Sequence, residues 1–477
     1  MKPTTALQDS LSRLLSGLES SWKNLSRRFR ILNHDFSEKM GTPAMKSHFV
    51  AVFFMSFILF AGYGVIATVM TMEIVEDQAD HQELCTSAFS TWMAESLISR
   101  QQGIMTDLDN AAQPLQAGVT QKALTAVLDR YPENKLIRDY LHRSTKTVAP
   151  FLSGTVADVK NWPLDRLSNG NAMIQNGSST YNKALEALVG SIAANQRNNE
   201  NGLWYWQNYP EWSYLDGMYS FAPFSALFNF NKHCSETSKQ EPYSSCTPIN
   251  DTMNDIFLQF SLLWKHCRNS TTGLLHHGYD ASKKATWAGR ATGSSPIVWG
   301  RSLGWYAMAL VDTLELLPAD TTTPWRDPLL EYFQELTFSI MESVDNLSGG
   351  WFQVVDQSGR KGNYIESSAT AMFSYALLKG ARLGYVGEKN VLMARSIGSR
   401  AHHYLTEAFV VREENGTLGW NGTVGVCSLN SSATYEYYVS QPIDYNNPFG
   451  AGAYILASVE AETLENATPN GNGTVCS

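Results

Sequence analysis

Apolar positions along most of this chain recur every three to four residues, the pattern of helices with one buried face. Long connections rich in glycine, asparagine and aromatic residues lie between these segments, at 199–215, 269–298, 344–366 and 411–447. Alternating short and long connections are typical of helical hairpins rather than of βαβ units. We therefore expect an all-α fold, with helices at roughly 85–101, 120–131, 135–149, 181–196, 216–230, 251–268, 300–316, 328–343, 367–383, 389–409 and 449–464.

One segment differs from this pattern. Phe49 to Met72 is an uncharged apolar run of about 24 residues, long enough for a tilted helix across a membrane. It lies too far from Met1, and is too long, for a cleaved signal peptide. Lys and Arg outnumber acids before it, whereas only acids follow it directly, so the positive-inside rule places the N-terminus in the cytosol. A buried core helix is the alternative.

These features predict the order of the domains. We expect a single-pass type II membrane protein with its main domain lumenal or extracellular. The parts are a cytosolic basic tail at 1–48, a transmembrane signal anchor at 49–72, a stem at 73–84, a helical domain at 85–465 and a glycosylated tail at 466–477.

The cysteines and glycosylation sequons agree with a lumenal or extracellular location of the main domain. All six cysteines follow the apolar run, as expected in an oxidising space where up to three disulfides form, although their connectivity stays open. Cys234 and Cys246 bracket a polar loop and are the pair that we expect. Asn-x-Ser/Thr sequons indicate a heavily glycosylated ectodomain and should fall in exposed loops. They begin at Asn176, Asn250, Asn269, Asn346, Asn415, Asn421, Asn430, Asn466 and Asn472.

Composition narrows the class of partner. The net charge of −9 argues against nucleic acid. Aromatic residues make up 12% of the chain, with 13 Trp concentrated after residue 200. Such an excess in an acidic, exported domain favours a carbohydrate, although a large core would also use many aromatic side chains.

The segment 294–306 carries the most specific chemistry. We expect Ser295 as the N-cap of a helix, Pro296 at its first position and Pro318 as its stop. Arg301 and Trp305 lie four residues apart and therefore share a helix face. Arginine offers a planar fork for a carboxylate, and tryptophan offers a stacking surface for a sugar ring. The alternative is a core tryptophan beside a solvated arginine at the rim.

Two other segments hold candidate acid–base groups. Asp216 stands where an aromatic loop enters a helix, so it is either an N-cap or a carboxyl whose proton can be transferred. His277 lies in a His-His-Gly-Tyr-Asp segment and is either structural or a partner that orients a substrate hydroxyl. Zinc-ligand spacing, a nucleophile elbow, a Walker loop and a dinucleotide fingerprint are all missing, so no metal or cofactor is expected.

Several motifs occur together in one order. They are LDRLSNG at 164–170, YLDGMY at 214–219, HGYD at 277–280, WGRSLGWY at 299–306, GNYIESSATAMF at 362–373 and YEYY at 435–438. In this the chain resembles the unsaturated rhamnogalacturonyl hydrolases, and the resemblance covers about residues 85–465. It implies an (α/α)6 barrel of six helical hairpins.

The resemblance also implies an unusual reaction. The substrates carry a 4,5-unsaturated galacturonyl residue at the non-reducing end of rhamnogalacturonan oligosaccharides, a product of pectin degradation by a lyase. An acid protonates C4, water adds at C5, and the resulting hemiketal opens and releases the aglycone. The carboxylate spacing rule for retaining and inverting glycosidases therefore does not apply.

Roles follow from the matched motifs. Asp216 is expected to donate the proton and to act as base toward water, with Asp165 as the second carboxylate and His277 as a hydrogen-bonding partner. Arg301 and Trp305 are expected to hold the uronate. Further expected substrate contacts are Trp299, Tyr205, Trp212, Tyr364 and Tyr438.

One departure bears on specificity. Many relatives have a histidine or basic residue after the equivalent of Trp204, where this chain has Tyr205 and Trp206. The sugar preference therefore stays open, and an unsaturated glucuronyl hydrolase is the alternative with the same chemistry. A non-catalytic, membrane-tethered sugar-binding protein and a glycosidase for saturated glycans are alternatives of other classes.

Overall fold

The computed structural model describes residues 88–107, 110–237, 250–317 and 324–466. The chain divides into two units, Met1–Cys85 and Thr86–Ser477, and the described residues belong to the second. No helix among these residues is both long and apolar enough to cross a membrane. The expected cytosolic tail, anchor and stem lie outside the described residues, as does nearly all of the expected C-terminal tail.

Six helical segments form a closed inner ring, in which each contacts the next and the last contacts the first. A segment packed on several sides must be apolar around most of its surface, and α11 is buried at every position from Gly300 to Leu314. The ring consists of α4 (Gln113–Arg130), η2 (Leu164–Asn169) with α7 (Gly170–Asn176), α9 (Asp216–Thr237), α11 (Gly300–Leu316), α13 (Ser367–Arg382) and α16 (Pro448–Asn466).

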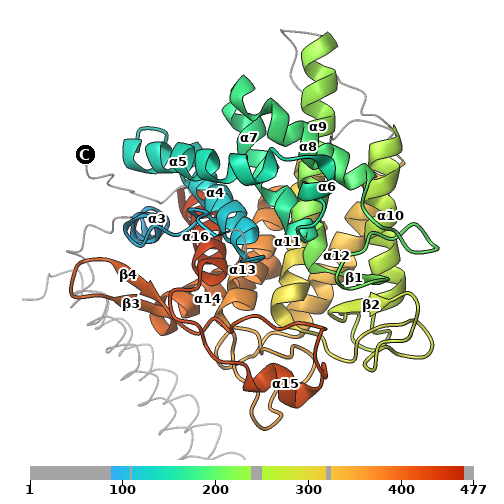
Figure 1. Cartoon of the computed structure of the whole chain (residues 1–477). Coiled ribbons are helices and arrows are strands. Elements are labelled where there is room, and N and C mark those ends of the chain that lie inside the picture. Colours follow the sequence, from blue (N-terminus) through green and yellow to red (C-terminus); the bar gives the residue numbers. More distant parts are fainter. Residues whose placement is uncertain (1–87, 108–109, 238–249, 318–323, 467–477) are drawn as a thin grey trace, which may run out of the picture. The chain divides into compact units, whose positions relative to one another are not determined.

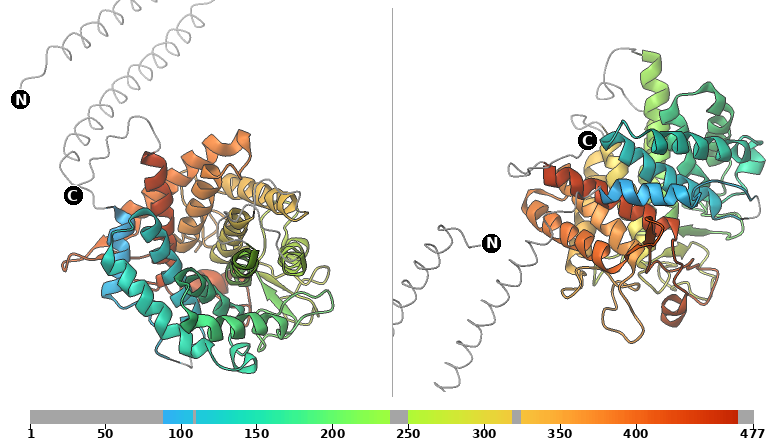
Figure 2. Two further views of the ribbon diagram at one scale, coloured as in Figure 1. Left: turned by 90° about the horizontal axis from the view of Figure 1, so that it is seen from above. Right: turned by 90° about the vertical axis from the view of Figure 1, so that its left-hand side faces the viewer.

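Six further helices pack on the outside of the ring and alternate with the inner ones along the chain. Figure 2 shows the chain passing round the unit in sequence order, with the first helix beside the last. This is the expected (α/α)6 arrangement. The outer helices are α3 (Phe89–Ser99), α5 (Lys135–Leu152), α8 (Asn182–Ala193), α10 (Asn250–Cys267), α12 (Arg326–Glu342) and α14 (Val391–Ala408).

Each expected helix overlaps an observed one, but two starts were clearly wrong. Helix α4 begins at Gln113, not at residue 120. Helix α11 begins at Gly300 with Trp299 as its N-cap, not at Ser295. Ser295 instead donates its backbone N–H to the carbonyl of Gly278, which holds residues 295–299 in an extended connection. Pro296 is therefore outside the helix, and α11 ends at Leu316, whereas Pro318 lies outside the described residues.

Short elements in the connections were not expected. The strands form two small antiparallel sheets, one of β1 (Trp212–Tyr214) with β2 (Gly278–Asp280) and one of β3 (Val410–Arg412) with β4 (Leu418–Trp420). The short helices of the connections that were missed are α6 (Val156–Val159), η3 (Ser179–Tyr181), η5 (Glu388–Asn390) and α15 (Tyr435–Ser440). The inner segment of η2 with α7 was missed as well.

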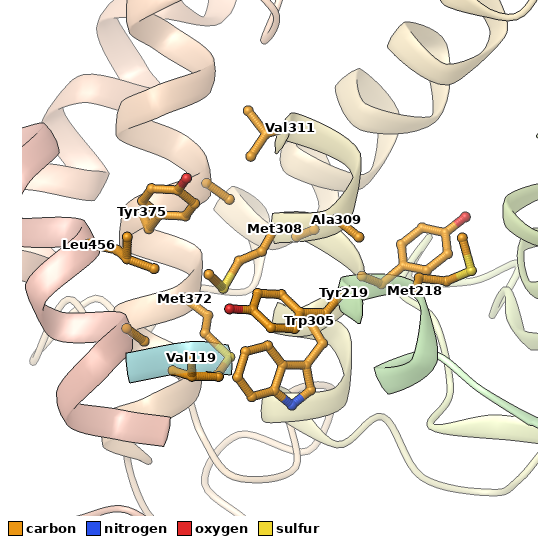
Figure 3. Close-up of a cluster of buried hydrophobic side chains, with 14 of the residues drawn as sticks. Val119, Met218, Tyr219, Trp305, Met308, Ala309, Val311, Met372, Tyr375 and Leu456 are labelled. Carbon is orange, nitrogen blue, oxygen red and sulfur yellow. The ribbon is translucent and has the colours of Figure 1, made fainter. Parts of the chain in front are cut away.

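Glycine lets α11 and α13 approach closely. A Cβ at Gly300 would lie 2.7 Å from the Cβ of Ala369, and one at Gly304 would lie 2.7 Å from the Cβ of Met372. Figure 3 shows Met372 beside Trp305 in the apolar centre of the ring. Substitution at either glycine would push the two helices apart and displace the residues between them.

A buried charge cluster lies toward the C-terminal ends of the same helices. The carboxylate of Asp312, 5% exposed, accepts hydrogen bonds at 2.7 Å from both Tyr375 and Lys379 and pairs with Lys122. Burial would raise the pKa of Asp312, but the two lysines outweigh it and hold the pKa at about 2. Lys379 also pairs with Glu315 at 2.6 Å.

The expectation of up to three disulfides was too high. Cys267 and Cys427 are free, buried thiols, so at most two disulfides can join the remaining four cysteines. Burial raises the pKa of both thiols, which keeps them protonated and unreactive. The pair Cys234 and Cys246 lies outside the side chains that the structure describes.

Candidate active site

The expected site residues gather where the inner helices begin. Asp216 is the first residue of α9, Arg301 the second of α11, and Glu366 the N-cap of α13. The long connections meet at this end of the barrel, together with α15, β1 and β2 (Figure 1). Because helix N-termini carry partial positive charge, this end favours an anionic ligand.

The small β1–β2 sheet brings Asp216 and His277 together. Tyr214 pairs with Gly278 in its register, and the N–H of Leu215 donates to the carbonyl of His277 at 3.1 Å. The residues that directly follow β1 and precede β2 are therefore neighbours. As a result, His277 Nε2 lies 3.4 Å from Asp216 Oδ2.

The carboxylate of Asp216 is held by another helix. Ser302 of α11 donates its hydroxyl to Asp216 Oδ2 at 2.5 Å. Among the hydrogen bonds of the described residues, none joins this carboxylate to the amides of its own helix, as an N-cap would require. The side chain is 12% exposed, so a partly accessible carboxylate is held by buried donors.

His277 is fixed from its other nitrogen. It is 1% exposed, and its Nδ1 lies 2.7 Å from the hydroxyl of Tyr438. The rings of Tyr214 and Trp299 flank the imidazole, with centroids 5.2 and 4.8 Å away. When Tyr438 donates to Nδ1, the ring proton is on Nε2 and faces Asp216.

Asp165 supplies a second carboxyl. It lies in η2, is 4% exposed and accepts a 2.6 Å hydrogen bond from the hydroxyl of Tyr205. Burial, with the charge of Asp216 adding to it, raises the pKa of Asp165 to about 7 even though the Tyr205 bond opposes the shift. Its Oδ1 is buried without a partner, so a substrate hydroxyl can bind there.

Asp165→Asn is expected to change the pH dependence of stability. Because the pKa of Asp165 is raised on folding, its contribution is full below pH 3.8 and is lost as the pH rises through about 7. Ionising this group in the folded protein costs up to about 4 kcal/mol, a cost that asparagine does not incur. The variant should therefore gain stability relative to the parent between pH 4.5 and 8 in urea unfolding. A difference that stays constant over this range would contradict the assignment.

Arg301 is a buried cation, not a solvated rim charge. It is 2% exposed, and its two terminal nitrogens donate to the carbonyls of Val424 and Gly425 at 2.6 and 2.5 Å. The guanidinium lies over the ring of Trp299, 4.7 Å from the centroid. Glu366 accepts the N–H of Val424 at 3.0 Å, so two buried charges hold the same loop.

The expected aromatic contacts divide into three groups. Tyr205, Trp299 and Tyr438 contact the carboxyl, arginine and histidine described above, and Tyr364 has a buried hydroxyl without a partner. Trp212 is half-buried farther out, where its ring packs against Trp287. Trp305 is buried, and its contact with the sugar stays a prediction.

Trp305 belongs to the core. It is 2% exposed, with its ring 4.4 Å from that of Tyr219 (Figure 3). It does share a helix face with Arg301, since both contact Phe449. Because α11 is buried all round, that face meets the centre of the barrel.

Sequence reasoning gave no role to two residues that organise the site. Ser302 directly follows Arg301, and Glu366 lies in a motif recognised only as a pattern. Glu366 is the N-cap of α13, and its carboxylate accepts the N–H of Ala369 at 2.6 Å. Glutamate is not among the residues favoured at this position, so the sequence carried no N-cap signal there. Nothing local marks Ser302, whose partner is 86 residues away.

A ring of six helical hairpins with two carboxyls where its inner helices begin is typical of the six-hairpin glycosidases. The family model of Glycosyl Hydrolase Family 88 matches residues 90–465, and the chain belongs to this family of glycoside hydrolases.

Individual relatives differ in the share of this chain to which they align. Protein Atu3128 of Agrobacterium fabrum is 36% identical over 231 residues, which are 47% of this chain and 97% of that protein. A family 105 glycoside hydrolase structure from C. acetobutylicum has 32% identity and a TM-score of 0.68, with 79% of this chain and 100% of that chain covered. The unsaturated glucuronyl hydrolase of Bacillus sp. GL1 has 12% identity and a TM-score of 0.57, over 79% and 95%, a likeness of fold alone.

Proposed function

We propose that this glycosidase hydrates the C4=C5 double bond of an unsaturated galacturonyl residue at the non-reducing end of rhamnogalacturonan oligosaccharides. The observation that carries the proposal is the pair Asp216 and Asp165. Asp216 is partly accessible and lies beside a fixed histidine, and Asp165 is buried with a raised pKa. Two neighbouring carboxyls in different environments, one partly accessible and one buried, are typical of acid–base pairs.

Asp216 has the position of the proton donor. In the proposed reaction its carboxylic acid transfers a proton to C4, and the ionised carboxylate then takes a proton from the water that adds at C5. One C–H bond and one C–O bond form, and the net change is the addition of one water molecule. The hemiketal then opens and the aglycone leaves as an alcohol. Asp165 Oδ1 and His277 Nε2 lack hydrogen-bond partners and are suited to bind sugar hydroxyls.

The carboxylate of the sugar belongs near Arg301. The guanidinium is buried among aromatic rings, and the N-termini of α11 and α13 add partial positive charge. Arginine has five N–H donors, so the bonds to the carbonyls of Val424 and Gly425 and to the hydroxyl of Ser368 leave others available.

Arg301→Met should weaken binding of the unsaturated uronate about 10- to 100-fold relative to its uncharged methyl ester, because a charge-assisted hydrogen bond is lost. The variant should also melt at a lower temperature, since two bonds to loop carbonyls disappear. Taking the ratio of the two ligand affinities, by calorimetry, removes the effect of general damage to the fold. A ratio equal to that of the parent would show that Arg301 only supports the loop.

A substrate panel tests the proposal. Unsaturated galacturonyl-rhamnose, an unsaturated glucuronyl disaccharide and saturated galacturonyl-rhamnose are each incubated with the protein, and the ultraviolet absorbance of the conjugated uronate and the released sugar are followed. We expect rapid loss of absorbance with the first substrate and no cleavage of the third. Preference for the second would identify a glucuronyl hydrolase, cleavage of the third an ordinary glycosidase, and binding without turnover a sugar-binding protein.

On the sequence pattern alone, we also propose a lumenal or extracellular domain anchored through residues 49–72. Five sequon asparagines of the described residues are exposed, namely Asn250, Asn346, Asn415, Asn421 and Asn430. The full chain expressed in eukaryotic cells should stay in the membrane pellet after an alkaline wash, and a glycosidase should remove its glycans only after detergent opens the membranes. Release by the wash would contradict the anchor.

A further inference from the structure

Two buried groups lie close to one oxygen of Asp216, the proposed proton donor, and a third holds one of them. Ser302 donates to Asp216 Oδ2 at 2.5 Å, and His277 Nε2 lies 3.4 Å from the same atom. Tyr438 fixes the histidine ring from its far side. The protein therefore contacts Asp216 through Oδ2, whereas Oδ1 has no hydrogen bond among the described residues.

Ser302 is well suited to hold this arrangement. It is 0% exposed and lies in the first turn of α11, close to where Gly300 brings the helix against α13. Its hydroxyl has one proton, and the carbonyl of His277, at 3.2 Å, is the more distant of its two acceptors. A buried serine without freedom to move therefore directs its proton to the carboxylate.

We infer that Ser302 is a positioning residue for the proposed hydration: it binds Asp216 Oδ2, so that the transferable proton resides on Oδ1 and faces the sugar. This inference rests on the proposed function. It assigns the roles of the two carboxylate oxygens, which the identity of Asp216 alone does not do. A proton on Oδ2 would face the hydroxyl of Ser302, 2.5 Å away, instead of C4 of the sugar.

Ser302→Ala is expected to lower kcat about 10- to 100-fold, which corresponds to loss of one hydrogen bond to a charged group, while KM changes less than about threefold. The alkaline limb of the pH–rate profile should move to higher pH by about one unit, because a donor that favours the ionised carboxylate has been removed. A merely structural serine would lower the melting temperature without moving this profile.

Matched variants distinguish a positioning role of Ser302 from a merely structural one. Ser374→Ala removes another fully buried serine hydroxyl, one that donates to Gly398 of α14 at 2.8 Å, and should leave kcat and the pH profile unchanged. Ser302→Cys fills the same space with a weaker donor, so it should reproduce the kinetic change if the alanine variant does not fold. Normal kcat and an unmoved profile in either Ser302 variant would overturn the inference. If the parent itself does not consume the unsaturated uronate, the proposed function has failed instead.

Discussion

Replacing Asp216 by asparagine is expected to reduce turnover of the unsaturated substrate by about 10²–10⁴, the usual contribution of a positioned acid–base group. This corresponds to about 3–5 kcal/mol of transition-state stabilisation. Asparagine keeps the shape of the side chain and an oxygen for Ser302, but it has no carboxylic proton to give to C4. Binding should survive, since Arg301 and Trp299 are untouched.

The measurement compares Asp216→Asn with Asp216→Ala by steady-state kinetics and thermal melting. A residue that acted only as a helix cap would give near-normal turnover in the asparagine variant and a loss of stability only in the alanine variant. The described hydrogen bonds favour the catalytic outcome, because Asp216 accepts from Ser302 of another helix. Near-normal hydration by Asp216→Asn would exclude it as the proton donor.

Asp312→Asn should have the largest effect on stability, with a loss of about 3–5 kcal/mol in the free energy of unfolding at neutral pH. The substitution removes the charge that compensates Lys122 and Lys379 in the interior. The loss should fall toward the lower value, because Lys379 keeps its pairing with Glu315 and the side chain of Lys122 is 23% exposed.

The control is Glu315→Gln, whose side chain is 42% exposed and whose charge should contribute less than about 1 kcal/mol. The pH dependence supplies a second check. Because the pKa of Asp312 is lowered to about 2, its contribution is full above pH 3.8 and is lost as the pH falls toward 2. In urea unfolding, parent and variant should therefore converge in acid. Equal stability at neutral pH would show that the cluster contributes nothing net.

The helices could be predicted because burial of one helix face makes apolar residues recur in the sequence with the helical period. Helices such as α5, with one buried face, show that period directly. The start of α11 could not be predicted in this way, because Ser295 and Pro296 are good local signals that a tertiary hydrogen bond to Gly278 overrides. The short elements of the connections were missed for a similar reason, since their few residues have no period to detect.

The site was predictable where chemistry is specific to a residue type, as for the carboxyls, His277 and Arg301. It was not predictable where the surroundings decide the role. Trp305 has the right chemistry and helix face for a sugar, but only the fold shows that its ring packs against Tyr219 and Phe449. Ser302 has no distinctive local pattern, and only the fold places it against Asp216.

The most direct measurement of the central claim is the order of two events on unsaturated galacturonyl-rhamnose, followed by stopped-flow absorbance and rapid-quench sugar analysis. Hydration led by Asp216 removes the double bond before the glycosidic bond breaks, so the absorbance of the conjugated uronate should disappear no later than rhamnose is released. Release of rhamnose ahead of the absorbance change would mean attack at the anomeric carbon and would contradict the account.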